Sequence, residues 1–239
     1  MKKHWCSGPS RTMGEFIGPR LGRYASMNPK VSLIIPVYNT SKHLVACLES
    51  VVSQSYKNIE VICVNDASTD QSAAILERYA GVDSRIRIVT HSRNKGLPAS
   101  RNTGMLHASG DYIRHVDSDD VLPLNSTQNL LEIATRYDSE IVVGNADRIS
   151  GAEIFEGDWL KRYMTPKYRI KLQDDVALWR TFGDVWLYLF NKKYVDKNQL
   201  RFHEEIQFGE DQIFVSSALA KASNISYCND TVYLYREHS

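Results

Sequence analysis

Hydrophobic residues follow two alternating periods between residues 31 and 143, and this alternation predicts a regular succession of strands and helices. Short, nearly continuous apolar runs such as 31–35 and 59–64 are typical of buried strands, whereas 41–54 places its apolar residues on one helical face. The predicted strands are 31–35, 59–64, 86–89, 112–116 and 141–143, and the predicted helices are 41–54, 69–80, 98–108, 126–137 and 212–222.

Three residues are expected to mark element boundaries. Pro36 should stop the first strand, since proline cannot donate to a strand ladder. Ser68 is predicted as the N-cap of the helix at 69–80, and Pro98 suits a first helical turn. Strands alternating with helices in this way predict an α/β fold with a mostly parallel sheet flanked by helices.

The pattern divides the chain into three parts. Residues 1–29 show no sustained period and are expected to form a poorly ordered extension. Residues 30–145 carry the regular alternation, and 146–239 form a smaller C-terminal subregion of the same domain, where the period weakens. Aromatic residues of this subregion, expected mainly in the core, are Trp159, Tyr163, Tyr168, Trp179, Trp186 and Tyr188.

Composition excludes several classes of protein. The 239 residues are 43% hydrophobic and 24% charged, and the net charge of +1 gives no field that would attract nucleic acid or an anionic membrane. No apolar run approaches the roughly 18–20 residues of a membrane span, and no secretory signal is visible. Peripheral contact with the inner face of a membrane stays open. The four cysteines match no zinc pattern and favour a reducing, cytoplasmic setting.

The most distinctive polar stretch is Asp117-Ser118-Asp119-Asp120, directly after the predicted strand 112–116. Mg²⁺ and Mn²⁺ take carboxylate oxygens and usually keep phosphate oxygens as further ligands. In isolation the stretch is more typical of a solvated acidic turn than of a metal site.

Three further polar segments follow the other predicted strands. The four segments are 36–39, 65–68, 94–96 and 117–120. Because the carboxyl ends of parallel strands share one edge of a sheet, we expect the segments to converge on one cleft. There Asp66 can accept hydrogen bonds from a base or a ribose, and Tyr38 can stack on a base.

At these residues the chain resembles the family 2 glycosyltransferases, which have the GT-A fold. The resemblance spans residue 31 to the C-terminus and rests on VSLIIPVYN (31–39), EVICVNDASTD (60–70), NKGLPASRNTG (94–104), GDYIRHVDSDD (110–120) and GEDQIF (209–214). It implies a GT-A type, Rossmann-like sheet, with residues 30–145 binding the nucleotide-sugar and 146–239 facing the acceptor.

The resemblance also implies the activity. The expected enzyme is a metal-dependent, inverting glycosyltransferase of hexosyltransferase type. It would move a sugar from a nucleotide diphosphate sugar, most simply a UDP-sugar, to a hydroxyl of a glycan or lipid-linked acceptor in surface polysaccharide biosynthesis. The expected cofactor is Mn²⁺ or Mg²⁺.

Residue roles are carried over from the same motifs. The residues implied to bind the donor are Pro36, Tyr38, Asp66, Asn94, Arg101, Asp117, Ser118 and Arg236. Among them, Asp66 would read the base, and Asp117 and Ser118 would contact the ribose or the metal shell. Arg236 lies in a YLYR stretch similar to the family's YxYR and could clamp a phosphate bidentately.

The metal and the base are implied at three other positions. Asp119 would be the direct metal ligand of the DxD motif, with His238 completing the metal shell or binding the diphosphate. Asp211 of the GEDQ stretch would be the general base that removes the acceptor proton. Apart from the resemblance, Glu210 and Asp211 also suit the first turn of a helix because they favour its dipole.

One motif departs from the family pattern. Where the family usually has two acids followed by glycine, this chain has Asn65, Asp66 and Ala67. The acid implied to read the base is retained, so the departure affects the geometry of the donor site rather than the resemblance.

Other functions fit the sequence less well. The segment 117–121 also satisfies the DxDx(T/V) pattern of haloacid-dehalogenase-like phosphatases, but three predicted strands precede it where that class has none. A nucleotidyltransferase would need a glycine-rich loop after the first strand, and a dinucleotide-dependent dehydrogenase would need GxGxxG there. An inactive nucleotide-sugar-binding subunit remains the non-enzymatic alternative.

Overall fold

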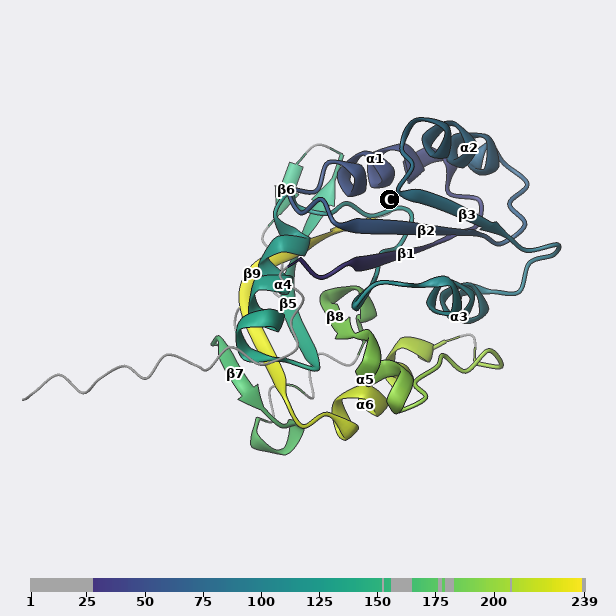
Figure 1. Ribbon diagram of the computed structural model, residues 1–239. Helices are drawn as coiled ribbons and strands as arrows, with labels where there is room; N and C mark the ends of the chain where they lie inside the picture. Colours follow the sequence, from purple (N-terminus) through teal and green to yellow (C-terminus); the bar gives the residue numbers. More distant parts are fainter. Residues whose placement is uncertain are drawn as a thin grey trace, which may run out of the picture.

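The computed structural model describes residues 28–151, 153–155, 165–175, 178, 183–206 and 208–237. Within them, nine strands form one sheet in the order β3-β2-β1-β4-β8-β5-β9-β7, and β6 pairs with β5 (Figure 1). The strands are β1 (Val31–Val37), β2 (Ile59–Asn65), β3 (Ile86–Thr90), β4 (Tyr112–His115), β5 (Ile141–Ser150), β6 (Glu153–Phe155), β7 (Lys167–Ile170), β8 (Tyr188–Asn191) and β9 (Ile225–Arg236). The helices are α1 (Ser41–Val52), α2 (Ser72–Val82), α3 (Leu97–His107), α4 (Ser126–Tyr137), α5 (Lys192–Lys197) and α6 (Glu210–Lys221).

The first four strands form the parallel part of the sheet. β1 pairs in parallel with both β2 and β4, and β2 pairs in parallel with β3. Buried apolar side chains fill both faces of β1, as expected of a parallel strand covered on each side. The carboxyl ends of these four strands therefore lie at one edge, as the sequence predicts.

The remaining strands form a mixed part that extends the same sheet. β8 lies antiparallel between β4 and β5, β5 and β9 run parallel, and β7 is antiparallel to β9. The predicted α/β class, with a central sheet flanked by helices, is confirmed. The proposed division between residues 145 and 146 falls inside β5, so both halves share one sheet.

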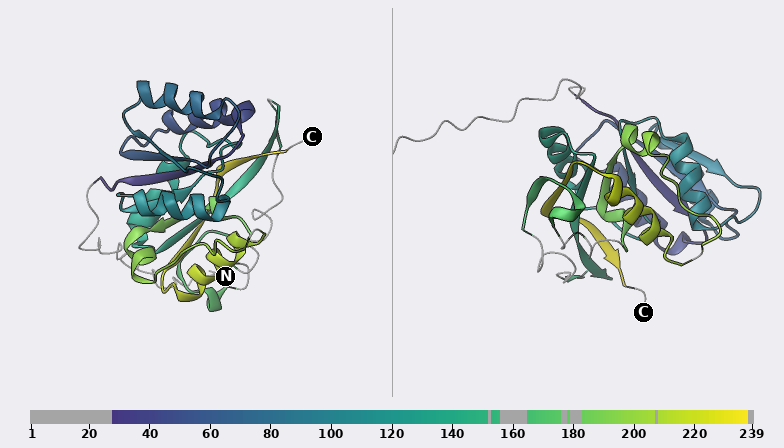
Figure 2. Two further views of the ribbon diagram at one scale, coloured as in Figure 1. Left: turned by 90° about the vertical axis from the view of Figure 1, so that its right-hand side faces the viewer. Right: turned by 90° about the horizontal axis from the view of Figure 1, so that it is seen from below.

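Helices cover both faces of this sheet. Figure 1 shows α1 and α2 on one face of the parallel strands and α3 on the other, with α5 and α6 on the side of α3; Figure 2 gives two further views. Aromatic rings fill the space between α6 and the sheet, where Phe214 stacks on Phe202 at 4.1 Å and meets His115 edge-on. Trp186 is buried in the core and stacks on Tyr233. Trp159, Tyr163 and Trp179 lie outside the described residues.

No helix among the described residues is long and apolar enough to cross a membrane.

Two predicted boundaries are wrong for physical reasons. Pro36 does not stop β1, which continues to Val37. The carbonyl of Val37 accepts from Asp66, on the β2 side, and the carbonyl of Ile34 accepts from Val116, on the β4 side. Because backbone groups alternate in direction along a strand, Pro36 faces the same side as Ile34, at a point beyond the end of β4. Its missing N–H therefore costs no ladder bond. Ser68 does not cap α2, whose N-cap is Gln71.

Ala67 adopts a backbone conformation that favours glycine. Its φ is +58°, in the left-handed region, where the β-carbon crowds the following carbonyl. The family's usual glycine at this position would avoid that contact. The turn keeps its shape because Asn65 Oδ1 accepts from the backbone N–H of Ser68 at 3.0 Å.

We expect Ala67→Gly to stabilise the protein. A non-glycine residue in the left-handed region costs roughly 1–2 kcal/mol, and the greater freedom of an unfolded glycine offsets roughly 0.4–1 kcal/mol of that. The free energy of unfolding in urea should rise by about 0.5–1 kcal/mol. Ala74→Gly, in the exposed first turn of α2, is the matched control and should lower it. An equal loss in both variants would contradict the account of residue 67.

Candidate active site

The carboxyl ends of the four parallel strands border a cavity of about 700 Å³. All four predicted segments contribute to it, so the expected convergence is found. The predicted site residues that line the cavity are Pro36, Tyr38, Asp66, Asn94, Asp117, Ser118 and Asp119. Tyr38 lines the cavity and leaves 48% of its surface exposed.

Hydrogen bonds lock the loops after β1 and β2 to each other. Asn39 accepts from the backbone N–H of Thr69 at 2.8 Å and donates its own N–H to Ser68. Asp70 accepts from the backbone N–H groups of Ser41 and Ser72, both at 2.9 Å. Ser68 was expected to cap a helix, but it instead links the two loops. Together these hydrogen bonds hold the loops after β1 and β2 as one wall of the cavity.

Asp66 is buried and already holds the third loop. Its side chain is 3% exposed, and its carboxylate accepts from the backbone N–H groups of Lys95 at 2.9 Å and Gly96 at 2.8 Å. His91 adds a third contact at 2.6 Å. The segment expected to read a base is thus also the anchor of the loop that precedes α3.

Strand β9 fixes the acidic turn at 117–120 from behind. The backbone N–H of Asp117 donates to the Tyr233 hydroxyl at 2.9 Å. Arg236 donates its backbone N–H to Asp120 and its Nε to the Asp119 carbonyl, both at 2.7 Å. Burial, and then the nearby charge of Asp117, raises the pKa of Asp120 to about 8. Arg236 therefore supports the turn from outside the cavity lining.

The acidic turn offers a divalent cation two carboxylates. Asp117 and Asp119 line the same cavity, with Ser118 between them. Across the described part of the chain, no three His, Cys, Asp or Glu side chains form a ligand cluster. This donor set fits a cation held by one or two carboxylates that completes its shell with substrate phosphates and water, as Mg²⁺ does. His238 lies outside the described residues.

Arg101, expected to line the donor site, is buried next to the acidic turn and is not one of the residues that line the cavity. Its side chain is only 1% exposed, and Nη2 donates to Asp117 at 2.9 Å. Nη1 donates to Glu210 at 3.3 Å and to Asp211. Burial weakens the charged form of Arg101, but the three carboxylates outweigh it and raise its pKa. One guanidinium therefore connects the acidic turn to the first turn of α6.

Two carboxyl groups that feel the charge of Asp117 hold their protons unusually tightly. Burial raises the pKa of Asp211 to about 7, since the loss of water outweighs the attraction of Arg101. Burial and the charge of Asp117 raise the pKa of Asp184 to about 6. A carboxyl group titrating near neutral pH can exchange a proton with a bound hydroxyl.

Three residues near the cavity were missed by sequence reasoning. Glu204 lines the cavity and accepts from the Asn102 amide at 2.9 Å. The other two are His91, which contacts Asp66, and Asp184, whose carboxyl group feels the charge of Asp117. Each comes from a segment without a recognised motif, and only the position of His91 directly after the third strand offered a signal.

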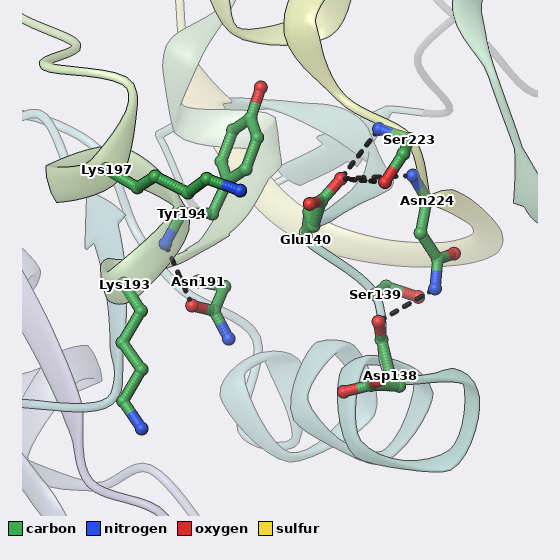
Figure 3. A pocket seen from close by; sticks show the side chains of 9 residues that line it. All are labelled: Asp138, Ser139, Glu140, Asn191, Lys193, Tyr194, Lys197, Ser223 and Asn224. Carbon is green, nitrogen blue, oxygen red and sulfur yellow. Dashed lines mark hydrogen bonds between the residues drawn. The ribbon is translucent and has the colours of Figure 1, made fainter. Parts of the chain in front are cut away.

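A second hollow, of about 350 Å³, lies where β5 and β9 begin, beside α5 (Figure 3). Glu140 accepts there from the backbone N–H groups of Ser223 and Asn224, at 2.7 and 3.1 Å. The Asn224 amide donates to the carbonyls of Tyr137 and Asp138. These bonds join the end of α4 to the start of β9, and none of the predicted site residues lines the hollow.

Comparison with known proteins identifies relatives over most of the chain. The chain is 34% identical over 215 residues to the uncharacterized glycosyltransferase EpsJ of Bacillus subtilis, which covers 89% of this chain and 62% of that protein. It is 31% identical over 209 residues to the poly(ribitol-phosphate) beta-glucosyltransferase of Bacillus spizizenii, covering 86% of this chain and 32% of that protein. The chain thus spans less than two thirds of the length of these relatives.

A solved structure shows the same fold. S. aureus TarS 1-349 in complex with UDP-GlcNAc superposes with a TM-score of 0.78 at 24% identity, over 88% of this chain and 59% of that one. The family model for glycosyl transferase family 2 matches residues 32–197, which include the cavity loops and Arg101. This chain belongs to glycosyl transferase family 2.

Proposed function

We propose that this chain is the catalytic part of an inverting, metal-dependent glycosyltransferase. It moves a sugar from a UDP-sugar to a hydroxyl of a glycan or lipid-linked acceptor in polysaccharide biosynthesis. The observation that carries the proposal is the ion-pair network of Arg101, which places Asp211 beside the acidic wall of the cavity. A base and a diphosphate site are thereby brought together.

The comparisons support the choice of donor and acceptor. The complex of TarS contains UDP-GlcNAc, which favours a UDP-sugar donor. The B. spizizenii relative is named for glucosyl transfer to poly(ribitol-phosphate), which favours a polymer hydroxyl as acceptor. In this proposal residues 30–145 bind the donor, 146–239 face the acceptor, and the protein acts at the cytoplasmic side of the membrane.

Donor binding uses the cavity loops. Tyr38 stacks on the base, and Asp66 accepts a hydrogen bond from it. Asp117 and Ser118 contact the ribose side, and Asn94 closes the opposite wall. Asp119 would hold Mn²⁺ or Mg²⁺, which when bound neutralises charge on the departing diphosphate. The Arg236 side chain keeps Asp119 in place by donating to the backbone carbonyl of Asp119.

Transfer is a direct displacement. The acceptor oxygen forms a bond to the anomeric carbon while the bond from that carbon to the UDP oxygen breaks. The acceptor proton passes to Asp211, and UDP leaves with the electron pair of the broken bond. Inversion requires Asp211 to take the proton on the face of the sugar opposite the departing UDP, and in this proposal α6 supplies the base while the acidic turn after β4 holds the diphosphate.

The first test is calorimetric binding of UDP and GDP with and without Mn²⁺. Wild-type protein should bind UDP about 10- to 100-fold more tightly when Mn²⁺ is present, because the cation adds two or three charge-assisted contacts to the diphosphate. Asp119→Ala should abolish this gain in UDP affinity. Asp196→Ala, which breaks a surface pair with Lys192, is the control and should bind normally. Absence of nucleotide binding in the wild type under all conditions would rule out the proposed enzyme.

The second test concerns the base. Only ionised Asp211 can accept the acceptor proton, so kcat/KM for transfer should rise with pH up to its pKa of about 7 and then level off. Asp211→Asn should bind UDP normally but lose at least about 100-fold in kcat. Asp196→Asn should keep the wild-type pH profile. Equal losses of UDP affinity and of kcat in Asp211→Asn would count against a role as base.

A further inference from the structure

His91 is a buried histidine at the end of β3 that the proposed mechanism does not use. Its side chain is 5% exposed, and both ring nitrogens are paired. Nδ1 lies 2.6 Å from Asp66 Oδ1, and Nε2 lies 2.9 Å from the Thr103 hydroxyl. The backbone N–H of His91 donates to the Asn65 carbonyl, so the ring sits on the continuation of the parallel sheet.

The partners determine which nitrogen carries a proton. An ionised carboxylate only accepts hydrogen bonds, so Nδ1 of His91 must donate to Asp66. In the neutral ring Nε2 is then the acceptor, and the Thr103 hydroxyl donates to it. The imidazole is therefore held between the end of β2 and the middle of α3 in one orientation.

This arrangement decides how Asp66 can be used. A carboxylate has about four acceptor positions. Oδ1 takes His91 and the N–H of Lys95, and Oδ2 takes the N–H of Gly96. One acceptor position on Oδ2 is left, and Asp66 is part of the cavity lining. His91 thus saturates one oxygen and leaves the other for a ligand.

The same contacts hold the wall formed by residues 94–96. Gly96 is the N-cap of α3 with φ +89°, and no side chain caps the helix. The loop instead donates two backbone N–H groups to the Asp66 carboxylate. If that carboxylate turned, the loop would lose both acceptors and Asn94 would move with it.

We propose that His91 is a positioning residue of the donor site. It orients Oδ2 of Asp66 toward the nucleoside, and it thereby keeps residues 94–96 in their position beside Asp66. The inference rests on the proposed function, since it assigns the nucleoside of the donor to this end of the cavity. His91 touches no reacting atom, so its loss weakens donor binding without changing acceptor binding.

Three substitutions separate orientation from packing. His91→Leu keeps the volume but removes both hydrogen bonds, and UDP affinity in the presence of Mn²⁺ should fall about 10- to 100-fold. His91→Asn places an amide N–H near the position of Nδ1 and should restore the affinity to within about threefold of wild type. His91→Gln carries its amide one bond further toward Thr103 and should not restore it. His107→Leu, on the partly exposed end of α3, is the control.

Calorimetry with UDP and Mn²⁺ gives the affinities, and steady-state transfer gives a second readout. The KM for the donor should rise in His91→Leu while the KM for the acceptor stays unchanged. Equal UDP affinity in His91→Leu and wild type, or equal loss in His91→Asn and His91→Gln, overturns the inference. If the wild type itself binds no nucleotide, the proposed function fails instead. Should His91→Leu not fold, the comparison of the Asn and Gln variants decides alone.

Discussion

The guanidinium of Arg101 is the point on which the arrangement of the site depends. It is almost completely buried, and it contacts Asp117 after β4 and both acids in the first turn of α6. Three carboxylates without this cation would be costly to hold in a site shielded from water. Because Asp211 lies 110 residues from Arg101 in the chain, the ion pair also fixes how α6 docks on the parallel strands.

Helix α3, which carries Arg101, contacts three other parts of the site. Its N-terminus is tied through Gly96 to Asp66, and Arg101 faces the acids on its buried side. One residue further, Asn102 donates to the carbonyl of Phe202 and accepts from its N–H, which fixes the loop that carries Glu204. A single helix of 11 residues thus aligns the loop that precedes it, the acidic turn and the C-terminal wall.

The strands and helices of the parallel half could be predicted from the sequence because they are determined by residues close together in the chain. The helix at 126–137 was placed correctly, and the four polar segments meet where the strand order requires. The sequence did not predict β8, a four-residue strand whose place between β4 and β5 depends on partners far along the chain. The burial of Arg101 and the pairing of Asp66 with His91 were missed for the same reason. A motif identifies a residue, but its hydrogen-bond partners follow from the fold.

The support of the acidic turn by β9 has a consequence for protein synthesis. Asp120 lies five residues after the end of β4, yet its partner, the backbone N–H of Arg236, comes 116 residues later. At roughly 5–20 residues per second, a ribosome needs roughly 6–23 seconds to add those residues. During that interval β1 to β4 can already pair, while the acidic turn lacks the strand behind it. A nascent chain can therefore pair its four parallel strands well before it has the strand that supports the acidic turn.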